Sequence, residues 1–198
     1  MVANSSNAMM DRLMGIITFK APVYKEVAED RTATPTAAMI VIGVAIIVGI
    51  INGLLSMGTT GSSAAGVIIG AVISSIIITP ITWFLNAWLL AFIAKSFFQG
   101  DTDTGEMLRV TGFAAIFRLV GIIPIIGGLI ALVLVIIANV IGIREAANFD
   151  TGKAVLTAII AAVIAFIVAL ILGIIIAIPL VALGFATGAI VVPTPTGQ

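Results

Sequence analysis

The sequence predicts an all-α, polytopic integral membrane protein, a bundle of five transmembrane helices preceded by a short N-terminal amphipathic and cytoplasmic helical segment. Three observations lead to this fold class. Of the 198 residues 61% are hydrophobic and 9% are charged, and the mean hydropathy of +1.32 is far above that of soluble domains. Several apolar runs are long enough to cross a bilayer, whose ~30 Å hydrocarbon core needs about 20 helical residues. The charged residues gather between these runs.

Residues 1–35 are predicted to form a cytoplasmic or interfacial segment. Apolar residues recur at helical spacing from Met9 to Ile17, opposite Asp11 and Arg12, which favours a short helix in the plane of the lipid headgroups. A second short helix is expected from Pro22, because the fixed φ of proline suits the first helical position. No cleavable export signal is expected, since Asp11 and Arg12 interrupt the first apolar run.

Residues 36–192 are predicted to form the transmembrane domain, and residues 193–198 a disordered tail. The five predicted spans cover about residues 36–57, 65–98, 107–122, 127–143 and 154–190. The second run is too long for one straight crossing and has no polar turn inside it, so we expect one helix that bends at Pro80. The last run is also long, and its residues allow either one crossing or a hairpin.

The basic residues predict the orientation. Eight of the nine cations precede the first span or flank the loops after the second and fourth spans, and the opposite loops carry none. The positive-inside rule then places the N-terminus in the cytoplasm and, after five crossings of the cell membrane, the C-terminus outside.

Composition also limits the kinds of function. Cysteine and histidine are both absent, which removes thiol nucleophiles, imidazole bases and the commonest transition-metal ligands. Nine acidic residues balance nine basic ones, so no net positive field favours nucleic acid. We expect no enzyme, no cofactor, no metal and no nucleic acid. The expected partners are membrane lipids and other membrane proteins, including further copies of this chain.

One charge lies inside a predicted span. Arg118 stands in the third span at a depth where arginine costs ~2.5 to 3.5 kcal/mol on insertion scales. Such a residue indicates a functional site, unless the span is shallow and the side chain reaches an interface. A stripe of polar residues on the second helix completes the candidate intramembrane site: Ser75, Thr79, Thr82 and Asn86. This stripe indicates either a solute path or interhelical hydrogen bonds around the bend at Pro80.

Two further groups of residues are candidates for contacts with partners. Three GxxxG pairs favour close helix packing, which does not prove dimerisation: Gly49 with Gly53, Gly66 with Gly70, and Gly184 with Gly188. Charged residues of the two loops on the predicted cytoplasmic side are candidates for partner binding: Glu106, Arg109, Arg144, Glu145 and Lys153. Asp103 and Glu106 also stand at the spacing of a capping box that begins the third helix.

The order of these features resembles the Ypt-interacting-protein (Yip) membrane family in its prokaryotic form, from about residue 10 to residue 190. The local matches are Phe19, Pro22, Tyr24 and Glu29 in the N-terminal segment, Glu106–Val110 with Gly112–Ala114 at the third helix, and Arg144–Ala146 with Gly152–Ala154 at the fifth. The resemblance implies five spans with a close hairpin between the third and fourth. Eukaryotic relatives work in vesicle traffic by binding lipidated small GTPases and one another, and the family defines no catalytic residues.

The leading functional hypothesis is therefore a non-enzymatic scaffold or adaptor that organises partners in the membrane. The alternative is a small-solute or ion transporter or channel with a polar path along the second and third helices, using Arg118 and the polar stripe.

Overall fold

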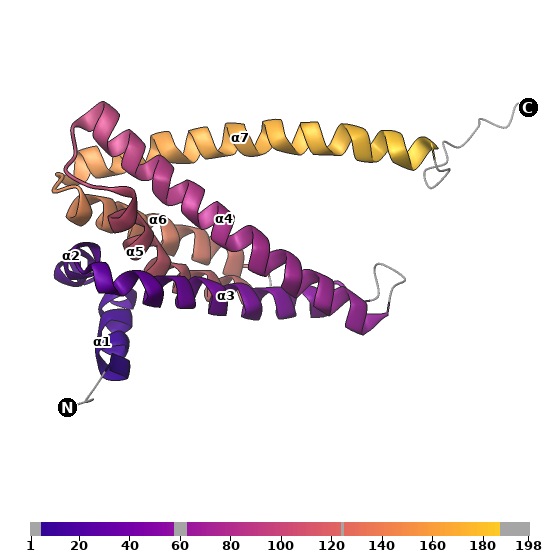
Figure 1. Ribbon diagram of the computed structural model, residues 1–198, viewed down its shortest axis with the longest axis horizontal. Helices are drawn as coiled ribbons and strands as arrows, with labels where there is room; N and C mark the ends of the chain where they lie inside the picture. The colour runs from indigo at the N-terminus through magenta and orange to yellow at the C-terminus, as the bar shows by residue number, and fades with distance from the viewer. Residues whose placement is uncertain (1–4, 58–62, 124, 187–198) are drawn as a thin grey trace, which may run out of the picture. The chain divides into compact units, whose positions relative to one another are not determined.

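All the regular structure in residues 5–57, 63–123 and 125–186, the part of the chain that the computed structural model describes, is helical (Figure 1). The order is α1 (Ser5–Ile17), α2 (Ala21–Glu29), η1 (Arg31–Ala33), α3 (Thr34–Leu55), α4 (Ala64–Phe98), α5 (Thr104–Ala114), η2 (Ala115–Ile122), α6 (Gly127–Ala146) and α7 (Thr151–Ala186). The all-α class is thus confirmed. The predicted tail, residues 193–198, lies outside the described residues.

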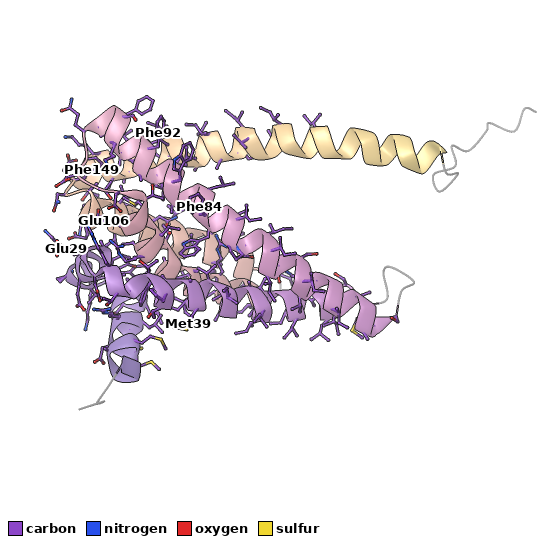
Figure 2. The ribbon with its side chains drawn as sticks, viewed as in Figure 1. Glu29, Met39, Phe84, Phe92, Glu106 and Phe149 are labelled. Carbon is purple, nitrogen blue, oxygen red and sulfur yellow. The ribbon has the colours of Figure 1, made fainter. Side chains whose placement is uncertain are left out.

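Four helices within the described residues are long and apolar enough to cross a membrane. They are Arg31–Leu55, Ala64–Phe98, Gly127–Ala146 and Thr151–Val168, and they occupy the first, second, fourth and fifth predicted spans. Large apolar side chains on these helices point outward: Met39, Phe84 and Phe92 are 61%, 52% and 48% exposed (Figure 2). Because so much apolar surface is stable only in contact with lipid, the chain is a membrane protein.

The third predicted span, residues 107–122, is not one regular helix. It consists of α5 followed by η2, a 3₁₀-helix of 8 residues, and the change begins where the amide of Ala115 donates to the carbonyl of Gly112, three residues earlier. At 1.5 Å per α-helical residue and 2.0 Å per 3₁₀ residue, α5 and η2 have a combined length of about 32 Å. The tighter winding of the 3₁₀-helix η2 therefore lengthens this segment, although neither α5 nor η2 alone is long enough to cross a membrane.

The second and last apolar runs are each continuous. Pro80 lies inside α4, which has 35 residues, so the second run is a single helix as expected. The last run forms α7 from Thr151 through Ala186, one helix as far as the described residues extend. The chain divides into two compact units, residues 1–161 and 162–198. The second unit contains the remainder of α7, and the first contains all the other helices.

The core of the first unit lies where α2 packs against α5 and α6. Its largest fully buried side chains include Ile16, Tyr24, Met107, Phe113 and Ile143. Close approach is possible because a Cβ on Gly142 would lie 2.1 Å from a methyl group of Val110, so only glycine fits there. The N-terminal segment is thus part of the folded unit and joins its core.

Candidate functional site

Charged residues from several elements lie at one end of the first unit, which we call the charged end. The start of α3, the end of α4, the start of α5, the end of α6 and the start of α7 meet there, as Glu29, Glu106 and Phe149 show at the left of Figure 2. Contacts between side chains far apart in the sequence join its segments. Lys25 Nζ donates to Asn148 Oδ1 at 3.2 Å, and the rings of Phe98 and Phe149 meet edge to face at 6.1 Å.

Four of the five predicted partner-binding residues remain at the surface of the charged end. Glu106, Arg144 and Glu145 are half-buried, and Lys153 is exposed. Arg144 Nη2 lies 2.9 Å from Glu145 Oε1, and Lys153 Nζ lies 5.7 Å from the centre of the Phe149 ring. These side chains form a mixed surface of both charges, accessible to a partner.

Arg109, the fifth of these residues, is buried at 5% exposure. Its Nε donates to the Ala28 carbonyl at 2.8 Å, its Nη2 donates to the same oxygen, and its Nη1 donates to Thr34 Oγ1 at 3.4 Å. Ala28 lies in the last turn of α2, where the free carbonyls and the helix dipole favour a cation. Arg109 thus joins α5 to the N-terminal segment and is not available to a partner in this structure.

The predicted capping box at the start of α5 is confirmed. The Glu106 amide donates to Asp103 Oδ1 at 2.8 Å, and the Asp103 amide donates to Glu106 Oε2 at 3.3 Å. Two backbone donors of the first turn are thereby satisfied by side chains. The Glu106 carboxylate therefore already has a structural role at the surface where a partner would bind.

The sequence analysis did not foresee how the N-terminal segment is held. Arg12 in α1 pairs with Glu26 at 2.9 Å and with Asp30 at 2.7 Å. Tyr24, fully buried, donates from its hydroxyl to the Ile16 carbonyl at 3.1 Å. Hydrogen bonding from the Thr32 hydroxyl, and then from Arg12, lowers the pKa of Asp30, and burial raises the pKa of Tyr24. The contacts of Arg12 and Tyr24 join α1 to α2 and to the residue that follows it, and the periodicity within one helix cannot reveal such pairings.

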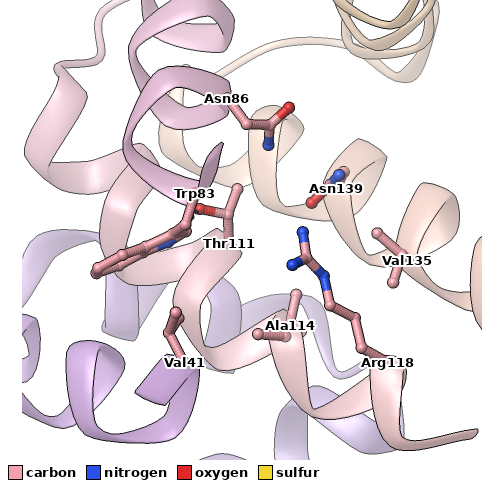
Figure 3. A pocket seen from close by; sticks show the side chains of 9 residues that line it. Val41, Trp83, Asn86, Thr111, Ala114, Arg118, Val135 and Asn139 are labelled. Atoms are coloured by element: carbon pink, nitrogen blue, oxygen red, sulfur yellow. Dashed lines mark hydrogen bonds between the residues drawn. The ribbon is translucent and has the colours of Figure 1, made fainter. Parts of the chain in front are cut away.

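Arg118, the candidate intramembrane charge, is exposed on η2, and its side chain also lines a small cavity in the first unit (Figure 3). Asn86 of α4 and Asn139 of α6 line the same cavity, whose volume is about 20 Å³. No hydrogen bond or ion pair joins Arg118 to any residue of the described part of the chain. The opposite wall is fixed, because Trp83 Nε1 donates to Leu108 O at 3.2 Å and to Thr111 Oγ1 at 3.1 Å.

The polar stripe on α4 divides between two roles. Asn86 lines the cavity with Arg118. Ser75 instead donates to the Ala45 carbonyl of α3 at 2.8 Å, and Thr82 donates to Ile78 O and Thr79 O of its own helix, both at 3.0 Å. Of the two predictions made for the stripe, Ser75 therefore confirms the interhelical hydrogen bond. Asn86 is the one residue of these four that lines the cavity with Arg118.

The glycine pairs have different surroundings. A Cβ on Gly49 would lie 2.3 Å from Ser75 Oγ, and one on Gly53 would lie 2.7 Å from Ile68 Cα, so this pair brings α3 close to α4. Gly66 and Gly70 are exposed, and nothing lies within 4 Å of a Cβ on Gly70. Gly184 lies in α7, and Gly188 lies outside the described residues.

Comparison with known proteins identifies the family. No curated protein and no solved structure matches the chain. The Yip1 domain matches residues 14–173, a range that begins in α1, includes the charged end and the Arg118 cavity, and ends in α7. Because the match covers most of the chain and agrees with the resemblance found in the sequence, this protein belongs to the Yip1 domain family.

Proposed function

We propose that this Yip1-family membrane protein is a non-enzymatic scaffold or adaptor that presents its charged end to partners in the cytoplasm. The observation that carries the proposal is the joining of distant segments into one charged surface. The N-terminal segment, the loop before α5 and the loop before α7 lie together there, connected by Lys25 to Asn148 and by Phe98 to Phe149. A surface assembled from three segments is suited to recognition of another macromolecule.

The orientation follows from the same surface. The positive-inside rule applies to the loops that carry Lys95, Arg109, Arg144 and Lys153, so the charged end belongs in the cytoplasm. The N-terminus then lies in the cytoplasm of a multi-pass protein of the cell membrane. If α5 and η2 together make one crossing, there are five crossings and the C-terminus lies outside.

Self-association is part of the proposal, and the pair Gly66 and Gly70 of α4 supports it. Gly49 and Gly53 already pack inside the chain, whereas Gly66 and Gly70 are exposed to the surroundings of the bundle. Lipid gives apolar side chains no incentive to associate, so helices meet where small residues let their backbones approach closely. A second copy of the chain or another membrane protein fits this face of α4.

Crosslinking in native membranes, followed by purification in gentle detergent, tests both self-association and the binding of cytoplasmic partners. We expect a crosslinked homo-oligomer and co-purified cytoplasmic partners from gentle detergent. Gly70→Ile should reduce the oligomer several-fold, because the added side chain keeps the helices apart. Gly128→Ile is the matched control, since Gly128 is also exposed with nothing within 4 Å of its Cβ position but belongs to no GxxxG pair. Recovery of monomer and lipid alone would contradict the scaffold.

The charged end has its own test. Combining Glu145→Lys with Lys153→Glu keeps the net charge and reverses the charge pattern on the two sides of the loop before α7. We expect this double variant to lose co-purified partners and to keep the crosslinked oligomer, because the exchanged residues lie at the charged end, where α4 ends, whereas Gly66 and Gly70 lie where α4 begins. Unchanged partner recovery would show that partners do not recognise this surface.

The second candidate function is a transporter or channel, and Arg118 with Asn86 and Asn139 favours it. The cavity they line, about 20 Å³, holds about one water molecule, and the hydroxyls of Ser75 and Thr82 are already bonded to backbone carbonyls. These features support the scaffold over a continuous polar path. Purified protein in liposomes separates the two: a scaffold passes no solute, whereas a channel passes solute and loses flux in Arg118→Leu.

A further inference from the structure

The turn between η2 and α6, residues 123–126, carries no polar side chain. Residues 119–143 contain no charged residue, and Asn139 is the one polar residue among them. The sequence between α3 and α4 is different, because residues 56–63 include five serines and threonines. A turn that lies in water is normally rich in polar residues. The two turns therefore suit different surroundings, although both connect helix ends that lie away from the charged end (Figure 1).

The apolar side chains around this turn are exposed. Ile125 is 97% exposed, Leu129 is 68% exposed, and Ile123 and Ile126 are each more than half exposed. We call these four residues the hairpin tip. Large apolar side chains that are grouped and exposed in this way indicate contact with something outside the chain.

The backbone of Ile125 supports the same conclusion. Its φ is 71°, in the left-handed region that glycine and asparagine tolerate and that a β-branched residue rarely adopts. Such strain persists where other interactions offset it. In water an almost fully exposed side chain gains nothing, whereas among acyl chains the same side chain is removed from water. An isoleucine at this position therefore fits a tip that is inserted into lipid.

The hairpin closes through its own backbone, as a lipid environment requires. The Ile123 amide donates to Val120 O at 3.2 Å, and the Gly127 amide donates to Ile123 O at 3.0 Å. A Cβ on Gly127 would lie 2.4 Å from Val120 O, so only glycine allows so tight a turn. No side chain of the described residues caps the start of α6, and its first amides still need acceptors. The ester carbonyls of lipids can accept these hydrogen bonds, and the hydrocarbon core cannot.

We propose that the hairpin tip is inserted into the lipid leaflet opposite the charged end, at the level of the ester groups and the first acyl carbons, and does not emerge into water. The partner of its apolar surface is lipid. The end of α3 and the start of α4 lie farther from the charged end than the start of α6 does (Figure 1). The turn between α3 and α4 therefore reaches water, and the tip stops below it.

This arrangement changes the number of complete crossings. The segment of α5 and η2 enters from the face of the charged end, and α6 returns to the same face. Two complete crossings are therefore lost as a pair, and the side of the membrane on which the C-terminus lies is unchanged. The inference uses only the position of the charged end at one face of the bilayer and is independent of the partners of the scaffold.

Single nitroxide labels measure the depth of the tip. The chain contains no cysteine, so Ile125→Cys and Leu129→Cys each carry one label in purified full-length protein reconstituted into phosphatidylcholine liposomes. Oxygen, which concentrates among acyl chains, and a water-soluble nickel chelate both relax the label by collision. We expect both tip labels to collide with oxygen several times more often than with the chelate. Ile78→Cys, exposed near the middle of α4, is the lipid-facing control, and Met57→Cys is the water-facing control.

Two results of this experiment would overturn the proposal. Collisions with the chelate that are as frequent at positions 125 and 129 as at position 57 would place the tip in water. Infrequent collisions with both reagents would show that protein, such as a second copy of the chain, covers the tip. Neither result affects the crosslinking test of the scaffold.

Substitutions at Ile125 give a second measure. Glycine and asparagine both tolerate the left-handed backbone, so a comparison of Ile125→Gly with Ile125→Asn is free of backbone strain. Among acyl carbons the asparagine amide loses its hydrogen bonds to water. In lipid bicelles Ile125→Asn should therefore unfold at a thermal midpoint several degrees below that of Ile125→Gly. Equal midpoints for the two variants would contradict insertion of the tip.

Discussion

Arg109 and Arg118 use the same side chain in opposite ways. Arg109 lies at the charged end yet is buried, with donors directed to the Ala28 carbonyl and the Thr34 hydroxyl. Arg118 is exposed on η2 and makes no hydrogen bond or ion pair with the described residues. The first is a structural link whose partner is a helix end, and the second makes no such link.

Arg109→Met should destabilise the protein by about 2 kcal/mol, because hydrogen bonds to a charged group contribute roughly 1.5 to 3 kcal/mol. The free energy of unfolding, measured by denaturing-detergent titration in mixed micelles, checks this. Lys153→Met is the control: its side chain is exposed, and its effect should stay within about 0.5 kcal/mol. Equal effects of the two substitutions would mean that the Arg109 link does not contribute to stability.

Tyr24 makes stability depend on pH in the alkaline range. Burial raises its pKa in the folded protein above the ordinary value of about 10. The unfolded chain therefore ionises first, and the stabilisation from Tyr24 is fully present below about pH 10 and declines as the pH rises further. The chain has one tyrosine, so phenolate absorbance follows this group alone and should appear at a higher pH in the folded than in the denatured protein.

Tyr24→Phe isolates this effect. It removes the hydrogen bond to the Ile16 carbonyl, at a cost of about 1 kcal/mol, and it removes the ionisation. The variant should lose less stability than the wild type between about pH 10 and pH 11. Parallel pH profiles for the two proteins would show that Tyr24 is not protected by burial.

In the structure Arg118 lies in η2 and is exposed, whereas sequence reasoning placed it deep in a span from chain length and rise per residue. It could not separate Arg109 from the surface charges, because the partner of Arg109, the Ala28 carbonyl, is 81 residues away. Burial of a polar side chain depends on contacts between elements, which local patterns do not specify.

At the scale of elements, the glycines of two GxxxG pairs stand in different surroundings. A Cβ on Gly53 would meet the backbone of Ile68 at 2.7 Å, whereas a Cβ on Gly70 meets nothing within 4 Å. A helix–helix contact made by glycine has no room for a methyl group unless the backbones separate. One sequence motif thus has two different structural uses in this protein.

Gly53→Ala should therefore destabilise the monomer by about 1 to 3 kcal/mol through overpacking. Gly70→Ala should be neutral or should stabilise α4 by up to about 1 kcal/mol through helix propensity. Thermal unfolding in detergent at a dilution that keeps the protein monomeric compares the two. A neutral Gly53→Ala would indicate that α3 and α4 separate easily.

Features of a helix that depend on neighbouring residues could be predicted from the sequence, and features that depend on packing could not. The capping box of α5 was predicted because both of its members lie within four residues of each other. The change from α5 to η2 was not predicted, because residues 107–120, apart from Arg109 and Arg118, are mostly apolar and contain no proline or polar turn to mark a break. The exposed Met10, Met14 and Ile17 on α1 agree with the predicted interfacial helix, since they lie on one face.

For the whole molecule, composition was sufficient to predict a membrane protein, because surface of this hydropathy has no stable arrangement in water. The apolar runs located the long helices, whose ends agree with the predicted spans within a few residues. Which helices contact one another was not predictable, because lipid-facing and buried positions are equally apolar. The joining of the N-terminal segment to α5 and α6 emerged only from the structure.

The proposed orientation can be tested on a chain that contains no cysteine. Single cysteines at Lys25, Lys153 and Met57, all exposed positions, give specific labelling with a membrane-impermeant maleimide. We expect Met57→Cys to react in intact cells, and Lys25→Cys and Lys153→Cys to react only after permeabilisation. Labelling of positions 25 and 153 from opposite faces would contradict the charged end as a single cytoplasmic surface.

The link from Arg109 to Ala28 also constrains biosynthesis. The ribosome completes α2 before it adds the 81 residues that separate the two partners, and at about 5 to 20 residues per second this addition takes roughly 4 to 16 s. During that interval α1 and α2 have emerged without the helix that anchors them. We expect the nascent segment to bind the membrane surface during this interval, through the apolar face of α1 that carries Met10 and Met14.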